Sequence, residues 1–284
     1  MTRPMDLELS AIHDPDGQPP LHLDAAVGYA RAVMDWDAQS IGPAVRTARD
    51  IAYGSHRLHR YNVFAPWGAE RAPVLVFWHG GGWTNGYRQW VTFMNRAAAS
   101  LGFVLVAPSY RLAPAYPLPA AVDDALAALE HIRDGIGTWG GDPDRVFLAG
   151  HSAGGQLAVL TALLAPDGVA ACLPVSGIMD LRHPAPPPGS LEELVYTTVL
   201  AEPGLDAAMS PVCRARPGSV PFLLTHGERD TDRVIRSNRT LAAQLAGYQV
   251  EVDVVEEPGA DHFQTHTALR SPAHPWYRRL AGPL

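Results

Sequence analysis

The sequence predicts an α/β protein in which a mostly parallel sheet is flanked by helices. Three observations support this prediction: a strand-like hairpin comes first, six short apolar runs follow it, and segments with helical periodicity separate those runs. Apolar runs of four to seven residues without polar alternation are typical of strands that are buried on both faces. The repeated order of strand, helix and strand then gives a parallel sheet with right-handed crossovers.

The first elements precede the parallel part of the sheet. Residues 1–20 are polar, contain prolines and lack the apolar core of a signal peptide. Residues 21–41 have a partly helical pattern. Residues 47–53 and 58–64 flank a Gly-Ser turn signal and predict two antiparallel strands.

Buried strands and helices then alternate along the chain. The six apolar runs are residues 73–78, 103–107, 146–149, 169–175, 220–225 and 250–255. Two intervening segments repeat apolar residues at helical spacing, with polar residues between them. These apolar residues are Val122, Leu126, Leu129 and Ile132 in the first segment, and Val234, Leu241 and Leu245 in the second.

Two regions interrupt this alternation. Residues 1–45 precede the sheet, and residues 178–215 contain a proline-rich stretch followed by a short helical stretch around 191–200. An insertion of this length in a compact fold is usually a functional loop or a cap. We therefore expect a single domain, 1–284, with a small cap formed by the arm 1–45 and the insertion 178–215.

Composition excludes several classes of function. A formal net charge of −7 and the lack of a basic run argue against a nucleic-acid partner. All 22 basic residues are arginine, so Schiff-base, pyridoxal phosphate and P-loop chemistry, which need a lysine, are excluded. The two cysteines, Cys172 and Cys213, do not form a metal-binding pattern. We expect no metal, no cofactor, no membrane partner and a cytoplasmic location, and the oligomeric state stays open.

A Gly-His-Ser-Ala-Gly segment, residues 150–154, follows the apolar run 146–149. In a Gly-x-Ser-x-Gly turn the chain passes sharply from a strand into a helix and exposes the serine hydroxyl in a strained conformation. A serine hydroxyl becomes a good nucleophile only when a base takes its proton and a third group orients that base. Ser152 is therefore the predicted nucleophile.

The order of residues after Ser152 predicts the orienting acid. In folds with such a turn the acid comes next in the chain and the histidine last. Three acids follow the run 220–225, namely Glu228, Asp230 and Asp232. Asp230 is the predicted orienting acid, and spacing alone leaves the other two as rivals.

The general base should follow the last strand. His262 comes shortly after the run 250–255 and is the predicted base. His266 is interpreted as a residue of the following helix. The three predicted catalytic residues would then meet at the carboxyl edge of the sheet, where ligands of open α/β sheets bind.

A glycine-rich loop provides the third component. His-Gly-Gly-Gly, residues 79–82, follows the apolar run 73–78. Three successive glycines allow the backbone to bend inward without a blocking side chain. Backbone N–H groups that point at the developing oxyanion of acyl transfer contribute about 3 kcal/mol each.

Together these motifs resemble the hormone-sensitive-lipase-like carboxylesterases of the α/β-hydrolase superfamily. The resemblance rests on residues 79–82, Tyr-Arg-Leu-Ala-Pro at 110–114 and the serine turn at 150–154, and it covers residues 47–265. It implies that Ser152 attacks, His262 transfers the proton and Asp230 steadies the imidazolium. It also implies that the oxyanion is bound by the N–H groups of Gly81, Gly82 and Ala153, while His79, Tyr110 and Arg111 are architectural.

The residue before the nucleophile departs from that group. It is usually Asp there and is His151 here. His151, the Tyr29-Ala-Arg segment, Tyr53-Gly54 and the segment 177–182 ahead of Ser210-Pro211 are similar to the arylformamidase branch of the same superfamily, whose members hydrolyse N-formylkynurenine. The tyrosine usual in the oxyanion loop of that branch is Gly82 here.

The leading functional hypothesis is a serine carboxylic-ester hydrolase that acts on small or aromatic esters through an acyl-enzyme. The alternative is an arylformamidase or amidase, and a second alternative is a ligand-binding relative without catalysis. The partner is in each case a small molecule. Trp83 and Tyr87 are candidate substrate-binding residues.

Overall fold

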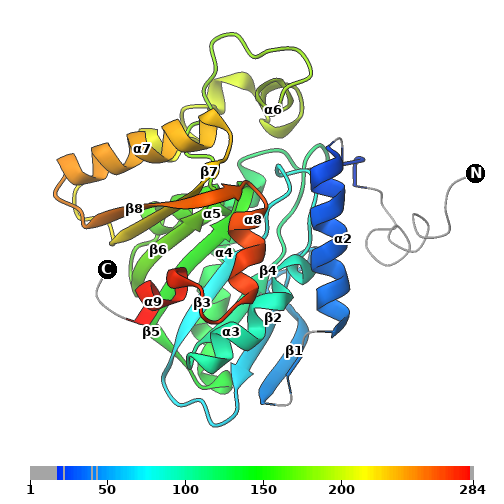
Figure 1. Cartoon of the computed structure of the whole chain (residues 1–284), viewed down its shortest axis with the longest axis vertical. Helices are drawn as coiled ribbons and strands as arrows, with labels where there is room; N and C mark the ends of the chain where they lie inside the picture. The colour runs from blue at the N-terminus through cyan, green and yellow to red at the C-terminus, as the bar shows by residue number, and fades with distance from the viewer. Residues whose placement is uncertain (1–17, 22, 40, 43, 282–284) are drawn as a thin grey trace, which may run out of the picture.

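One sheet with helices on both faces forms the described structure (Figure 1). The computed structural model describes residues 18–281 except 22, 40 and 43. In these residues eight strands lie in the order β1-β2-β4-β3-β5-β6-β7-β8. They are β1 Val45–Ala52, β2 Arg60–Pro66, β3 Ala72–Trp78, β4 Val104–Pro108, β5 Gly141–His151, β6 Val169–Val175, β7 Phe222–Arg229 and β8 Val252–Asp261. β2 is antiparallel to β1 and β4, and the other neighbours are parallel, which confirms the predicted fold class.

Three strands run further than the apolar runs that predict them. β5 ends at His151, β7 at Arg229 and β8 at Asp261. Arg229 and Asp261 are paired with each other in the ladder between β7 and β8. Each strand thus ends one residue before a predicted catalytic residue. Backbone hydrogen bonds rather than side-chain polarity set these ends, because a ladder continues wherever the neighbouring strand can pair.

The last strand differs from its prediction in burial. The run 250–255 predicts a strand that is buried on both faces, but β8 is the edge of the sheet, and Val254 is 42% exposed. The prediction of burial on both faces is therefore wrong for this strand. Glu251 and Asp253 alternate with valines in this run, a pattern typical of a half-exposed strand, and an edge strand has only one neighbouring strand beside it.

Helices cover both faces of the sheet. One face carries α4 Ala120–Gly135, α5 Ala153–Leu164 and α7 Asp232–Gly247. The other carries α2 Asp24–Gln39, α3 Asn95–Ser100, α8 Gln264–Thr267 and α9 Pro275–Ala281 (Figure 1). Short 3₁₀ turns occupy Arg88–Met94, Ile136–Trp139, Pro203–Leu205, Pro211–Cys213 and Ala268–Arg270. The two helices predicted from periodicity are confirmed as α4 and α7.

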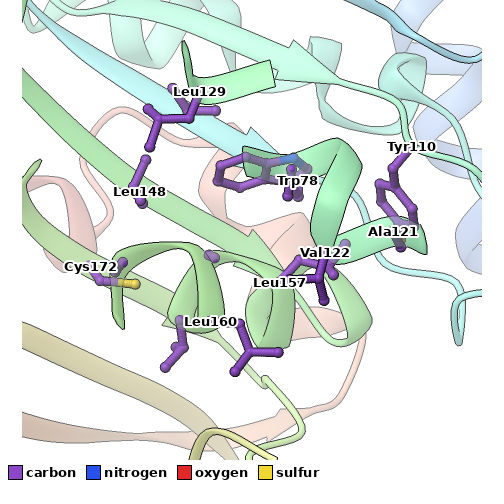
Figure 2. Close-up of a cluster of buried hydrophobic side chains, with 14 of the residues drawn as sticks. Trp78, Tyr110, Ala121, Val122, Leu129, Leu148, Leu157, Leu160 and Cys172 are labelled. Carbon is purple, nitrogen blue, oxygen red and sulfur yellow. The ribbon is translucent and has the colours of Figure 1, made fainter. Parts of the chain in front are cut away.

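The larger part of the core lies between the sheet and α4, α5 and α7. In Figure 2, Trp78 of β3 and Leu148 of β5 lie on the same side of the sheet as the helix residues Leu129 and Leu157. Side chains of α5 are buried on every side from Ala153 to Leu163. This central position holds the start of α5, and with it the serine turn, rigidly against the sheet.

The insertion is anchored to this core. Its helix α6 Leu191–Leu194 continues into a π-helical turn, Val195–Val199. The side chains of Val195 and Val199 are buried in the core on the α4, α5 and α7 side of the sheet. Leu200 pairs with Leu118 in an isolated bridge. The cap formed by the arm and the insertion stays a prediction, and the first 17 residues of the arm lie outside the described residues. Among the described helices, none has the length and apolar character needed to cross a membrane.

Candidate active site

Ser152 occupies the turn between β5 and α5. Its φ of 55° is a conformation that residues with side chains rarely adopt, and its N–H donates to Val175 O at 3.0 Å. A Cβ on Gly154 would lie 2.2 Å from Trp78 O, and one on Gly150 would lie 2.3 Å from Gly154 O. Both positions therefore require glycine, because the backbones cross there. The Gly-x-Ser-x-Gly spacing follows from this crossing.

The three predicted catalytic residues are brought together. Ser152 Oγ lies 2.9 Å from His262 Nε2, and His262 Nδ1 lies 2.7 Å from Asp230 Oδ1. Because an ionised carboxylate only accepts hydrogen bonds, Nδ1 carries the proton of the neutral imidazole, and this N–H donates a hydrogen bond to Asp230. Nε2 is then free to accept the hydroxyl proton of Ser152, which is the arrangement that a general base needs.

Asp230 is separated from its two rivals by position. Its side chain is fully buried, whereas Glu228 is exposed and accepts from Gly259 N at 2.7 Å, and Asp232 is exposed as the first residue of α7. Burial alone would raise the pKa of Asp230, but the hydrogen bond from His262 and the charge of that histidine hold it below the usual value. Asp230 is therefore ionised at neutral pH.

The predicted oxyanion loop lies against the nucleophile. A Cβ on Gly80 would lie 3.2 Å from Ser152 Cβ. Gly81 and Gly82 have φ values of 120° and 61°, and Gly81 O accepts from Thr84 N and Asn85 N, so the loop curls back on itself. In the described part of the chain, no protein acceptor binds the N–H of Gly81, Gly82 or Ala153. Their role as an oxyanion hole stays a prediction.

His79 holds the oxyanion loop through its side-chain contacts. It is fully buried, its Nδ1–H donates to Gly80 O at 2.7 Å, and its ring stacks on Tyr110 at 4.4 Å. The hydroxyl of Tyr110 donates to His79 O at 3.0 Å. Burial lowers the pKa of His79 to about 4, so the ring is neutral at pH 7. These contacts fix the loop, which agrees with the architectural interpretation of both residues.

Trp83 and Tyr87 lie beyond the glycines. Trp83 is 1% exposed, and its Nε1–H donates to Gln156 Oε1 at 3.0 Å. Gln156 in turn donates to Met209 O at 2.8 Å, so the loop is tied both to α5 and to the insertion. Tyr87 is half-buried beside Trp90. The Trp83 ring is enclosed in the core, and this position favours a supporting role over the predicted contact with substrate.

Replacing Trp83 by Phe distinguishes these two roles. The variant leaves Gln156 Oε1 buried without its donor, and we expect the free energy of unfolding to fall by about 1–3 kcal/mol in urea titrations. Trp67→Phe is the control, because Trp67 is 66% exposed and the change should stay within about 0.5 kcal/mol. Unchanged stability together with a raised KM for aryl esters would instead make Trp83 a substrate contact.

His151 has a structural role that the sequence did not reveal. It is 1% exposed, and its Nε2–H donates to the backbone oxygen of His262 at 2.8 Å. The same oxygen accepts from Thr265 Oγ1 at 2.9 Å. Two donors therefore hold the backbone of the predicted general base. The sequence marks His151 as a departure from a family pattern, but its partner lies 111 residues away, beyond the reach of a local pattern.

A buried histidine pair extends this support to the N-terminal helix. The rings of His151 and His266 stack at 4.9 Å, and Tyr29 Oη of α2 lies 2.7 Å from His266 Nδ1. Burial lowers the pKa of His266 to about 3. Burial also holds the pKa of His151 well below its usual value, and the nearby His262 and His266 lower it further. Both rings are neutral at pH 7. The prediction that His266 lies in the following helix is confirmed, since it belongs to α8.

Removing the His151 donor should loosen the general base. For His151→Leu we expect kcat to fall about 10- to 100-fold with little change in KM, because small displacements of a base are costly in rate. His151→Gln keeps a donor and should recover part of kcat. His131→Gln is the control, because His131 contacts Tyr61 instead of the site. An unchanged kcat for His151→Leu would contradict a positioning role.

In the described residues, no three His, Cys, Asp or Glu side chains are grouped so as to hold a metal ion. Ser152 is hydrogen-bonded to His262, which is hydrogen-bonded to Asp230 and has its ring 4.9 Å from that of His151.

Comparison with known proteins agrees with this architecture. Residues 75–266 match the model of a protein family whose description is alpha/beta hydrolase fold. The chain is similar to Esterase LipQ of Mycobacterium tuberculosis, with 32% identity over 249 residues, 78% of this chain and 58% of that protein. It is also similar to Esterase LipC of the same organism, with 32% identity over 67% of this chain and 53% of that protein. The chain thus spans little more than half the length of these relatives.

Solved structures share the fold. The carboxylesterase EstE1 from a metagenomic library superposes with a TM-score of 0.71 and 23% identity, over 88% of this chain and 96% of that chain. An esterase of Pyrobaculum calidifontis gives a TM-score of 0.76 at 22% identity, over 98% of this chain and 95% of that chain. At such identities the likeness concerns the fold.

Proposed function

The chain belongs to the α/β-hydrolase fold family, and from this premise we propose that it is a serine hydrolase of carboxylic esters. One observation carries the proposal: Ser152, His262 and Asp230 are linked by contacts of 2.9 and 2.7 Å at the carboxyl edge of the sheet. The names of the esterase relatives support the same reaction type. The free N–H groups beside Ser152 supply what acyl transfer needs in addition.

The proposed acylation step gives each of these groups one role. Ser152 Oγ attacks the ester carbonyl carbon while His262 Nε2 takes the hydroxyl proton, and the carbonyl oxygen becomes an oxyanion. The N–H groups of Gly81, Gly82 and Ala153 stabilise this charge, and Ala153 adds the positive end of α5. The imidazolium, held by Asp230, then gives its proton to the departing alcohol oxygen.

Deacylation repeats these roles with water as the nucleophile. His262 takes a proton from water, the hydroxide attacks the acyl carbon, and the carboxylic acid leaves as Ser152 Oγ recovers its proton from the imidazolium. Atoms and charge balance with water alone. The reaction therefore requires no redox partner.

The insertion supports small or aromatic esters as substrates. A Cβ on Gly82 would lie 3.8 Å from Leu191 Cδ1, so α6 of the insertion reaches the oxyanion loop. Leu191 is 39% exposed, and Ser152 only 6%. This contact supports the proposal that the insertion narrows the approach to Ser152 and so disfavours bulky acyl chains. We propose that residues 178–215 act as the cap that sets specificity.

Formamide hydrolysis is the second candidate, and His151 is the observation that favours it. The same residues would act, but the histidine must protonate a poorer leaving group. At Gly82 the φ of 61° disfavours the tyrosine usual in that branch, so ester hydrolysis is preferred. A ratio of kcat/KM for N-formylkynurenine to that for aryl acetates far above one would reverse this order.

Hydrolysis of p-nitrophenyl acetate by the purified protein tests the proposal directly. We expect turnover with a burst of p-nitrophenol, as acyl-enzyme accumulates, and covalent labelling of Ser152 by a fluorophosphonate probe. A folded protein that neither turns over aryl acetates nor is labelled would support a ligand-binding relative instead.

A further inference from the structure

The N-terminal arm is tied to the loop that follows the three glycines. Gln18 Nε2–H donates to Gly86 O at 3.1 Å, and Gln18 Oε1 accepts from Gly86 N at 2.9 Å. One side-chain amide thus pairs with both backbone groups of one residue, as a residue on a neighbouring antiparallel strand does. Asn85 Nδ2–H donates to Pro19 O at 2.6 Å and adds a third hydrogen bond.

The backbone of Gly86 depends on this pairing. Gly86 is buried, and in the described residues no main-chain group bonds to its N–H or to its carbonyl oxygen. Buried backbone groups are normally paired, because leaving them without a partner costs free energy. Gln18 therefore supplies the partner that a strand or a helix supplies elsewhere. Without Gln18, exposure to water would satisfy these two groups, so the loop would tend to open.

Gly86 in turn packs against the predicted oxyanion loop. Its φ is 109°, and a Cβ here would lie 2.4 Å from both Gly80 O and His79 Nδ1, so no side chain fits between them. The residue before it, Asn85, donates its N–H to Gly81 O at 2.9 Å. A movement of Gly86 would therefore displace the glycines of the loop as well.

The same contacts continue to the nucleophile. A Cβ on Gly80 would lie 2.7 Å from His151 Nδ1 and 3.2 Å from Ser152 Cβ. Close packing thus runs from Gln18 through Gly86 and Gly80 to Ser152. In so tight an arrangement, the loop keeps its shape beside Ser152 only while Gly86 keeps its place.

We propose that Gln18 is a positioning residue that holds the oxyanion loop in its catalytic shape. The inference rests on the proposed ester hydrolysis and adds a residue of the arm to that site. Gln18 acts through Gly86 and takes no part in the bond-making steps. The oxyanion forms only in the transition state, so N–H groups that turn away from it lower kcat and leave KM nearly unchanged.

Kinetics of Gln18→Met with aryl esters test this role. Methionine is similar in length but has no hydrogen-bond donor and only a weak acceptor. We expect kcat to fall about tenfold or more and KM to stay within about twofold, because displacements of about 1 Å cost up to about 100-fold in rate. The fall in kcat should be equal for p-nitrophenyl acetate and butyrate, since both esters present the same carbonyl oxygen.

Gln249→Met is the matched control. It makes the same change at an exposed position between α7 and β8 and should leave both constants unchanged. An unchanged kcat in Gln18→Met overturns the proposal. A raised KM with unchanged kcat also overturns it, and would make Gln18 a contact of the substrate.

Hydrogen–deuterium exchange of the full chain tests the anchor without using activity, with thermal melting as a check of folding. In Gln18→Met, the peptide that spans residues 79–87 should exchange faster than in the wild type, whereas Gln249→Met should leave it unchanged. Equal exchange of this peptide in Gln18→Met and the wild type contradicts the proposal. Faster exchange in a protein whose wild type hydrolyses no ester would instead reject the proposed function and retain the anchor.

Discussion

Ser152→Ala is expected to lower kcat for p-nitrophenyl acetate by about five orders of magnitude and to abolish fluorophosphonate labelling. The loss is large because serine, histidine and aspartate act as one unit, and without the nucleophile no acyl-enzyme forms. The fold should persist, because alanine removes one oxygen from a turn held by Gly150, Gly154 and the Val175 carbonyl.

The matched control for this variant is Ser100→Ala. Ser100 lies in α3 and its hydroxyl donates to Ala97 O. Removing this hydroxyl should lower the free energy of unfolding slightly and leave kcat unchanged. Stopped-flow rates, binding of a substrate analogue and thermal melting should be compared for both variants. Wild-type turnover by pure Ser152→Ala protein would reject Ser152 as the nucleophile.

Asp230→Asn is expected to lower kcat about 10⁴-fold with a modest change in KM. The amide keeps the shape of the carboxylate but loses its charge, and its NH₂ group favours the imidazole tautomer that cannot accept from Ser152. The buried position of Asp230 makes this effect strong, because no water replaces the missing acceptor.

The two neighbouring acids serve as controls. Glu228→Gln and Asp232→Asn remove the same charge from exposed positions within two residues of Asp230, and each should retain kcat within about tenfold. A loss in Asp232→Asn as large as that in Asp230→Asn would transfer the orienting role to Asp232.

The sequence predicted the elements that position the site, because their physical causes are local. Short apolar runs predicted the parallel strands, and the glycines of the serine turn predicted the crossing of β5 and α5. The order of a serine, an acid and a histidine along the chain predicted Ser152 and His262, and it narrowed the acid to Glu228, Asp230 and Asp232.

Other features depend on contacts between distant segments, and local patterns do not contain them. The choice of Asp230 over two nearby acids depends on which side chain turns inward after β7. The hydrogen bond from His151 to His262 depends on how the loop after β8 crosses the serine turn. The enclosure of Trp83 depends on Gln156, which is 73 residues away.

The buried histidines set an acid limit for the whole protein. His79, His151 and His266 have pKa values in the fold below their ordinary value of 6.5. The unfolded chain therefore takes up more protons, so the stabilisation is complete above pH 6.5 and is lost as the pH falls. At pH 5 the rings of His79 and His266 each cost about 2 kcal/mol, and the lowered pKa of His151 acts in the same direction. This is a large part of the stability of an ordinary domain. Loss of activity in acid then includes a contribution from the melting of the histidine-lined core.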